Sequence, residues 1–298
     1  MNLRYMKTLD YRKVDAFTSG NSLGNPAACI YLQEGENLTD AEMLDIAKQH
    51  KGFVSEVIYC TPEPEHTFGL VYYSSECEVD FCGHGTIACM YSLIAENPNL
   101  TGRKEITIVT GKKGALTVFN EIETQNAVYI TAPNPQYIGT KLPINEIADN
   151  LSLRQNQISM SHPIDLIDAG LRTLTVPLVH LDDGISVFPD ERRLKEFCLH
   201  HGIDIVLIFT LETANPQNMA HTRVFAPKFG HLEDPATGSG NSAFGYYMLK
   251  NGIWDGKPIT IEQGGKDRVF NTVHLAYRNQ QMLFGGKATT RIKGVYYV

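Results

Sequence analysis

A twelve-residue segment occurs twice in this chain of 298 residues, at positions 155 apart. The first copy reads Gly83-His-Gly-Thr-Ile-Ala-Cys-Met-Tyr-Ser-Leu-Ile94, and the second reads Gly238-Ser-Gly-Asn-Ser-Ala-Phe-Gly-Tyr-Tyr-Met-Leu249. Four positions are identical, and Glu78 and Glu233 stand in register ahead of the two copies. Because the offset is close to half the chain, we interpret the sequence as two copies of one domain.

Length and a proline-rich midpoint agree with this interpretation. At roughly 100–200 residues per domain, a chain of this length favours two domains. The segment Ala132-Pro-Asn-Pro-Gln136 is the best linker candidate, since its two prolines stop both strands and helices. We therefore expect an N-terminal domain at residues 1–132, completed by a C-terminal strand at 292–298, and a second domain at 133–291.

Composition and charge restrict the classes of binding partner and the cellular compartment that we expect. The chain is 43% hydrophobic, which supports a core, and its formal net charge of −7 comes without a long Lys/Arg run. That balance argues against nucleic acid or an anionic membrane as the main partner. The apolar stretch 203–211 is far shorter than a membrane span, and the first thirteen residues lack a secretory signal. We expect a cytoplasmic protein whose six cysteines are reduced.

The pattern of apolar residues predicts many short strands and a few capped helices. Thr39 with Glu42 forms a capping box for a helix that ends at Gly52. A short helix should begin near Pro143, and a helix over Asp190–His201 should end at Gly202. Strands are expected at 27–32, 53–60, 68–73, 106–110, 115–119, 127–131, 173–178, 203–211, 260–263, 269–275, 281–287 and 292–298.

Each repeated segment is a glycine-rich turn that opens a helix, which directs free backbone N–H groups at an anion. Both turns also match G-x-G-x-x-A, but no apolar parallel strand precedes either one, so we do not expect a nucleotide site. Cys77, Cys82, His84 and Cys89 lie close in sequence without the paired C-x2-C spacing of structural zinc sites. We expect buried free thiols there and no metal ion.

Glu56 is the most informative carboxylate. Strand alternation places it on one face with Val54, Ile58 and Cys60. If that face points inward, burial raises the pKa of Glu56, which suits a general acid/base; otherwise Glu56 points to water. His84, Asp234 and Ser239 flank the two glycine turns. Taken singly they are ordinary capping and turn residues, but together they could supply a base, an orienting acid and anion-binding helix ends to one cleft.

An ordered set of motifs resembles a known family. Val14-Asp-Ala-Phe-Thr18, Gly24-Asn-Pro26, Ser55-Glu56, Cys82-Gly-His-Gly-Thr86 and Glu233-Asp-Pro-Ala-Thr-Gly-Ser239 occur in this order, with Arg223-Val-Phe-Ala-Pro227 and Gln263-Gly264 in support. The set resembles the PhzF-like, or phenazine biosynthesis-like, family of the diaminopimelate epimerase superfamily. The resemblance covers essentially the whole chain.

The resemblance implies an α+β fold of two similar domains, each a barrel-like antiparallel sheet around a central helix. The central helices would span residues 84–96 and 239–251, and the active cleft would lie between the domains. Family members resemble cofactor-independent isomerases, and homodimers are common among them. We therefore expect a small carboxylate-bearing substrate, a homodimer, and neither cofactor nor metal.

The resemblance also implies roles for individual residues. Glu56 would remove and return the proton, with His84 and Asp234 as its polar partners. Backbone N–H groups near Gly83 and Gly238 would hold the substrate carboxylate, because helix N-termini stabilise developing negative charge. Further substrate-binding residues would be Ser239 and Asn25.

Two departures from the phenazine enzyme leave alternatives open. Cys82 replaces an alanine before the Gly-His pair, and the segment 265–269 replaces a Gly-Arg-Pro motif. One alternative is a cofactor-free dehydratase or epimerase of a cyclic or other amino acid that depends on Cys82, with Thr237 at the matching place in the second turn. Another is a relative that binds a small molecule without turnover. Symmetric two-thiol racemisation is disfavoured, since Thr237 cannot form a thiolate.

Overall fold

The computed structural model describes residues 7–265 and 267–298. Residues 1–6 and Lys266 lie outside the described residues. The predicted lack of a secretory signal and the predicted start of the first domain fall partly on residues 1–6. The chain divides into two compact units. Unit 1 takes in residues up to Thr18, Leu23–Ile130 and Gly286–Val298, and unit 2 takes in Ser19–Ser22 and Thr131–Gly285. The domain boundaries expected from the sequence stay a prediction.

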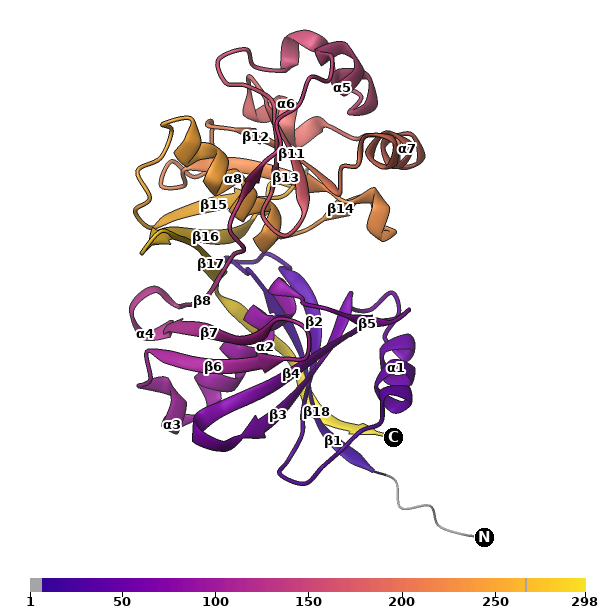
Figure 1. Ribbon diagram of the computed structural model, residues 1–298, viewed down its shortest axis with the longest axis vertical. Helices are drawn as coiled ribbons and strands as arrows, with labels where there is room; N and C mark the ends of the chain where they lie inside the picture. Colours follow the sequence, from indigo (N-terminus) through magenta and orange to yellow (C-terminus); the bar gives the residue numbers. More distant parts are fainter. Residues whose placement is uncertain (1–6, 266) are drawn as a thin grey trace. The chain divides into compact units, whose positions relative to one another are not determined.

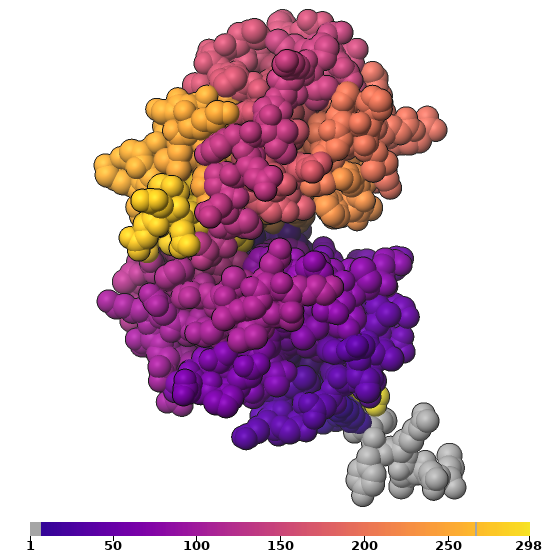
Figure 2. Space-filling model, in the orientation of Figure 1, coloured from indigo at the N-terminus to yellow at the C-terminus, as the bar shows by residue number. Residues whose placement is uncertain are grey.

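Unit 1 is built from strands of both ends of the chain around one long helix (Figure 1). Its strands are β1 (Thr8–Ala16), β2 (Asn25–Tyr31), β3 (Glu56–Glu63), β4 (Thr67–Ser74), β5 (Glu78–Val79), β6 (Glu105–Thr110), β7 (Gly114–Glu121), β8 (Ala127–Thr131) and β18 (Ala288–Tyr297). Its helices are α1 (Asp40–Gln49), α2 (Gly83–Glu96), α3 (Pro98–Thr101), α4 (Ile122–Gln125) and the 3-10 turn η1 (Pro64–His66). On the face seen in Figure 2, the indigo-to-magenta residues of the first half of the chain form nearly all of the surface of unit 1.

Strand pairing in unit 1 is mostly antiparallel, with two parallel pairs. The antiparallel pairs are β18–β1, β1–β2, β3–β4, β4–β5, β6–β7 and β7–β8. The parallel pairs are β2–β3, with α1 in the connection, and β4–β6, with α2 in the connection. Each parallel pair thus has a helix between its strands, as crossover connections require.

Unit 2 consists of a second set of the same elements. Its strands are β9 (Gln136–Tyr137), β10 (Asp165–Asp168), β11 (Arg172–Pro177), β12 (Ile205–Thr210), β13 (Ala220–Phe225), β14 (Glu233–Asp234), β15 (Ile259–Gln263), β16 (Asn271–Arg278) and β17 (Gln281–Gly286). Its helices are α5 (Ile144–Asn150), α6 (Leu181–Ser186), α7 (Glu191–His201), α8 (Gly238–Lys250) and the 3-10 turns η2 (Gln155–Gln157) and η3 (Pro227–Phe229).

The pairing order of unit 2 repeats that of unit 1. The pairs β9–β10, β10–β11, β12–β13, β13–β14 and β15–β16–β17 are antiparallel, and β11–β12 and β13–β15 are parallel. Helix α8 falls between β13 and β15 as α2 falls between β4 and β6. The predicted α+β fold of two similar units, each with a central helix, is confirmed.

The central helices are buried because they lack a polar face. In α2 the residues from Gly85 to Met90 are all buried, and α8 is buried from Gly240 to Met248. A helix that is apolar on all sides needs partners on all sides. Helix α2 contacts β1, β2, β3 and β18, and α8 contacts β10, β11, β12 and β16. Figure 1 shows α2 enclosed by the strands of its own unit.

Amphipathic helices cover the outer faces of the sheets. In unit 1, Met43, Ile46 and Ala47 of α1 pack with Ile30 and Tyr59 of the sheet. In unit 2, α5 and α7 share a second cluster with β10–β13. Each sheet therefore has a central helix on its inner face and a smaller helix on its outer face. In the described part of the chain, no helix combines the length and the apolar character that a membrane crossing requires.

Predicted elements match where local signals are strong. The strand at Ala127–Thr131 has the expected bounds, and Thr39 and Glu42 form the expected capping box of α1. Helix α1 ends at Gln49, three residues before the predicted Gly52, which instead takes a positive φ in the following turn. Helix α7 has Asp190 as its N-cap and Gly202 in the left-handed conformation after its end, as predicted.

The strands absent from the sequence prediction include β1 and β13, each of which carries buried charge. Arg12 of β1 donates to the carbonyl and hydroxyl oxygens of Ser92 at 3.2 and 3.0 Å, and its guanidinium lies 4.4 Å from the centre of the Tyr31 ring. Arg223 of β13 donates to both carboxylate oxygens of Glu233 at 2.9 and 2.8 Å. Buried charges need such partners, which strand alternation alone does not reveal.

Glu262 of β15 connects a loop to the sheet, and we predict that it makes unit 2 sensitive to acid. Its carboxylate accepts from the backbone N–H groups of Ala214 at 2.6 Å and Asn215 at 3.1 Å and from Asn218 Nδ2 at 2.8 Å, and it lies 3.2 Å from His221 Nδ1. Burial raises the pKa of Glu262, but these donors outweigh burial and leave its pKa below the usual value.

A carboxyl with a lowered folded pKa contributes stability above its unfolded pKa and loses it as the pH falls through the folded pKa. Glu262→Gln should therefore lower the free energy of unfolding at neutral pH by about 1–3 kcal/mol and flatten its decline in acid. Urea unfolding between pH 3 and pH 7, about the range in which carboxyls titrate, measures both effects. Glu196→Gln, at a side chain of α7 that is 72% exposed, is the control, and an equal loss there would contradict the prediction.

Candidate active site

Glu56 lies on the inner face of unit 1, at the first residue of β3. Its register partners are Ala27 on β2 and Ser74 on β4. Ile58, which shares its face, packs on the first turn of α2: a Cβ added to Gly85 would lie 2.7 Å from Ile58 Cδ1. The face that carries Glu56 therefore points towards the start of α2. The predicted strand over 53–60 begins only at Glu56, so the carboxylate stands at the start of the strand, with its side chain 20% exposed.

Cys82 is the N-cap of α2, and its thiol takes the place of the usual hydroxyl. Its Sγ accepts from the backbone N–H of Gly85 at 3.3 Å, and its carbonyl oxygen accepts from Thr86 Oγ1 at 2.7 Å. N-cap side chains satisfy helix donors that have no intrahelical partner. The cap fixes the position of Cys82 and of His84, two residues further along the helix.

Glu56, Cys82 and His84 come together at this helix end. His84 Nε2 lies 3.2 Å from Glu56 Oε2. Cys82 Sγ lies 3.7 Å from the same carboxylate oxygen and 3.5 Å from His84 Nδ1. Cys82 is buried, whereas the side chain of His84 keeps 14% of its surface exposed. The three side chains form a compact acid/base group in which His84 and Glu56 keep some contact with solvent.

The local charges set the protonation of two of these groups. Burial raises the pKa of Cys82, an effect that His84 opposes and Glu56 reinforces. Burial alone would lower the pKa of His84, but Cys82 and Glu56 outweigh it and hold the His84 pKa well above its usual value. An imidazolium beside Glu56 favours the carboxylate form, which is the form a base needs.

The second glycine turn, in unit 2, has its own polar network. Asp234 of β14 accepts from the hydroxyl of Thr237, the N-cap of α8, at 2.6 Å. Gln263 of β15 accepts from the backbone N–H of Thr237 at 3.0 Å and donates to the carbonyl oxygen of Asp234 at 2.8 Å. Ser239 is half-buried at the second residue of α8. These hydrogen bonds hold the turn against β14 and β15.

Gly238 is required by close packing. A Cβ there would lie 2.2 Å from Phe284 Cε2, so any side chain would displace the aromatic ring. Gly83, its counterpart, begins α2 and is half-buried. Asn25, the first residue of β2, is 2% exposed and stands two residues before Ala27, the partner of Glu56. The roles that the sequence analysis gives to these residues stay predictions.

Asn241, which is not among the residues predicted from the sequence, supports the second turn. Asn241 Nδ2 donates to the carbonyl oxygen of Thr237 at 2.8 Å and to Gln263 Oε1 at 2.7 Å. The 155-residue offset places Asn241 opposite Thr86, which donates in the same way to the N-cap carbonyl of α2. The sequence repeat could have pointed to Asn241, because it aligns Asn241 with Thr86 although the two residues differ.

The cysteine cluster seen in the sequence is not assembled as one group. Cys89 is fully buried inside α2, while Cys77 is exposed, so the prediction of a buried Cys77 is wrong. Cys77 lies in the turn before β5, where its carbonyl oxygen accepts from Ser74. In the described residues all six cysteines are free thiols, and Cys82 and His84 are joined by Glu56 instead.

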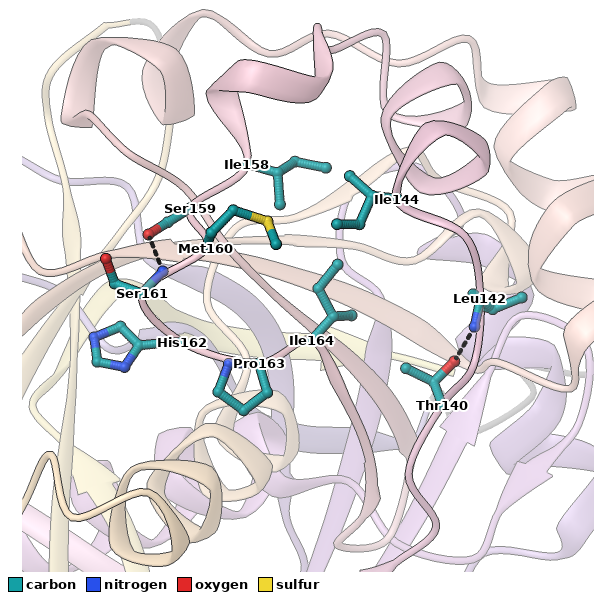
Figure 3. Close-up of a pocket in the computed structure, with 10 residues that line it drawn as sticks. All are labelled: Thr140, Leu142, Ile144, Ile158, Ser159, Met160, Ser161, His162, Pro163 and Ile164. Carbon is teal, nitrogen blue, oxygen red and sulfur yellow. Dashed lines mark hydrogen bonds between the residues drawn. The ribbon is translucent and has the colours of Figure 1, made fainter.

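A shallow apolar cavity lies elsewhere in unit 2, between the segment that leads into α5 and the loop after η2 (Figure 3). Its walls are mostly apolar side chains, with His162 at one end. None of the site residues expected from the sequence lines it. The lining residues are Thr140, Leu142, Ile144 and the continuous run 158–164.

Comparison with known proteins identifies the family. The family described as phenazine biosynthesis-like protein (PhzC-PhzF) matches residues 14–294. The uncharacterized isomerase YfhB of Bacillus subtilis is 31% identical over 88% of this chain and 89% of its own. Trans-2,3-dihydro-3-hydroxyanthranilate isomerase of Pseudomonas fluorescens is 28% identical over 86% of this chain and 85% of its own.

A solved structure agrees with these relatives. The crystal structure of the Bacillus anthracis phenazine biosynthesis protein of the PhzF family superposes with a TM-score of 0.84 at 25% identity, covering 98% of this chain and 99% of that one. The match extends over both units and both glycine turns. The chain therefore belongs to the phenazine biosynthesis-like (PhzC-PhzF) family, whose relatives named here include isomerases.

Proposed function

We propose that this protein is a cofactor-independent isomerase that moves a proton on a small carboxylate-bearing substrate, with Glu56 as the general acid/base. The observation that carries the proposal is the contact of 3.2 Å between Glu56 Oε2 and His84 Nε2 at the first turn of α2. A base at a helix N-terminus can take a proton from carbon while backbone N–H groups stabilise the charge that develops. The chain's own side chains and backbone can carry out both the proton removal and the charge stabilisation.

His84 supports this role through its charge. Its pKa is held well above the usual value, which favours the imidazolium form beside Glu56. It can also donate to an oxyanion that forms on the substrate. We assign substrate binding to Gly83, Asn25, Gly238 and Ser239, and a polar partner role to Asp234, from their places in the family motifs.

The relatives support the substrate class. The name of the Pseudomonas fluorescens relative specifies an anthranilate derivative, which carries a carboxylate. Helix N-termini such as that of α2 are suited to carboxylates. By family resemblance we further propose that the protein works in the cytoplasm as a homodimer, within a biosynthetic pathway.

A second candidate function follows from Cys82. Its Sγ lies 3.5 Å from His84 Nδ1, so a Cys82-dependent dehydratase or epimerase would have a base at hand. The raised pKa of Cys82 weighs against it, because the nucleophile or base in such chemistry is the thiolate. In this candidate Thr237, whose hydroxyl donates to Asp234, would be the counterpart in the second turn.

We predict that Glu56→Gln removes proton exchange. The protein is incubated in deuterated water with a panel of amino acids and cyclic carboxylic acids, and label uptake is read by mass spectrometry. Loss of a general acid/base should reduce the exchange rate by about 10²–10⁴-fold. Glu63→Gln, at the exposed end of the same strand, is the matched control and should exchange at the wild-type rate.

Cys82→Ala separates the two candidate functions in the same assay. We expect exchange to persist in this variant, because the proposed proton transfer runs through Glu56. A Cys82-dependent enzyme gives the opposite pattern, in which Cys82→Ala is inactive and Glu56→Gln is not. A protein that binds members of the panel by calorimetry, yet takes up no label in any form, would be a non-catalytic relative.

A further inference from the structure

We propose that Glu56, Cys82 and His84 form a binding site for a zinc-class divalent cation, and that the bound cation inhibits the enzyme. The inhibitory consequence rests on the function proposed above, whereas the binding itself does not. The site is built from three donor types that zinc takes in proteins: a thiolate sulfur, an imidazole nitrogen and a carboxylate oxygen. One donor atom from each residue lies within 4.8 Å of the other two.

The distances fit tetrahedral coordination. Zinc bond lengths of about 2.0–2.3 Å at tetrahedral angles separate neighbouring donors by about 3.3–3.6 Å. With Nε2 as the histidine donor, the separations here are 3.2 Å to Glu56 Oε2, 3.9 Å to Cys82 Sγ, and 3.7 Å between sulfur and carboxylate oxygen. Shifts of a few tenths of an ångström would therefore bring all three donors onto one cation.

The backbone holds the donors in place before any cation arrives. Cys82 is fixed as the N-cap of α2, and the Gly85 N–H that points at its sulfur would stabilise the thiolate. His84 is held two residues along the same helix, and Glu56 begins β3. Ligands on fixed elements lose little conformational freedom on binding, which strengthens the site.

Solvent contact at His84 and Glu56 gives a cation a way into the site. The side chains of His84 and Glu56 remain 14% and 20% exposed, so a cation can enter from solvent and keep one water ligand. Binding releases the Cys82 proton and the His84 proton to solvent, because the metal needs a thiolate and a neutral imidazole, and the thiolate and carboxylate then balance the two positive charges. Magnesium and calcium, which require oxygen ligands, should not bind here.

A coordinated cation would block the proposed proton transfer. The cation would occupy the Glu56 oxygen and the His84 nitrogen that the proton transfer needs, and it would lie where the substrate proton must approach. Occupancy and turnover would therefore exclude each other, so the cation is an inhibitor rather than a cofactor.

Cobalt(II) titration of the chelator-treated full chain tests the binding directly, without an activity assay. We expect one Co²⁺ per chain, with a thiolate-to-cobalt charge-transfer absorption in the near ultraviolet and visible bands of four-coordinate intensity, both removed by added Zn²⁺. Cys82→Ser should abolish the charge-transfer band, while serine preserves the helix cap. Glu56→Gln should weaken binding by at least about 10–100-fold, the loss seen for supporting residues of metal sites.

Cys77→Ser is the matched control, since it removes the exposed cysteine that lies outside the site. It should leave the spectrum and the stoichiometry unchanged. Bound Co²⁺ without a charge-transfer band, or a band that persists in Cys82→Ser and disappears in Cys77→Ser, would overturn the proposal. Circular dichroism verifies that each variant is folded.

The deuterium-exchange assay then tests inhibition. Exchange should stop when Zn²⁺ saturates the site and return when EDTA removes it, and Mg²⁺ should have no effect. Full exchange with the site saturated would refute inhibition. Cobalt binding without exchange on any substrate would refute the proposed isomerase and leave the metal site standing, whereas exchange without cobalt binding would do the reverse.

Discussion

The structure depends on burying a helix that has no polar face. Residues 85–90 of α2 and 240–248 of α8 are buried all round, so strands must cover each helix on every side. This requirement explains why each unit wraps its sheet around the helix rather than stacking the helix on one face. It also explains where the candidate residues lie. Only the end of such a helix reaches polar surroundings, and the candidate residues collect at the N-termini.

Close packing at two glycines fixes the positions of the helix ends. Gly85 brings the first turn of α2 against Ile58, and Gly238 brings that of α8 against the Phe284 ring. With no side chain between helix and strand, the N-cap residues Cys82 and Thr237 are held at the edge of the sheet. The repeated glycines that identify the duplication in the sequence are thus the residues that set the geometry of each turn.

Much of the fold could be predicted from residues whose signals are local. The capping box at Thr39, the helix from Asp190 to Gly202 and the paired glycine turns each depend on a few neighbouring positions. The family resemblance then supplied the arrangement of strands around the helices. Strands β1 and β13 could not be predicted in this way, because Arg12 and Arg223 are stabilised by partners that only the folded chain brings near.

The candidate site shows the same division. Glu56, Cys82 and His84 could each be selected from motifs, and the repeat linked Cys82 to Thr237. The distances between these residues could not be predicted, because Glu56 lies 26 positions before Cys82 in the chain. The exposure of Cys77 was also unpredictable, because it depends on a turn held by Ser74 rather than on alternation.

The pairing of β18 with β1 has a consequence for how the protein is made. Strand β18, at residues 288–297, is the only strand of unit 1 in the described residues that follows unit 2 in the sequence, and it pairs along the whole of β1. A ribosome releases almost all of unit 2 before it releases this strand. Unit 2 can therefore fold during synthesis, while unit 1, although its first 130 residues emerge earlier, must keep β1 unpaired on one side until residues 288–297 have emerged.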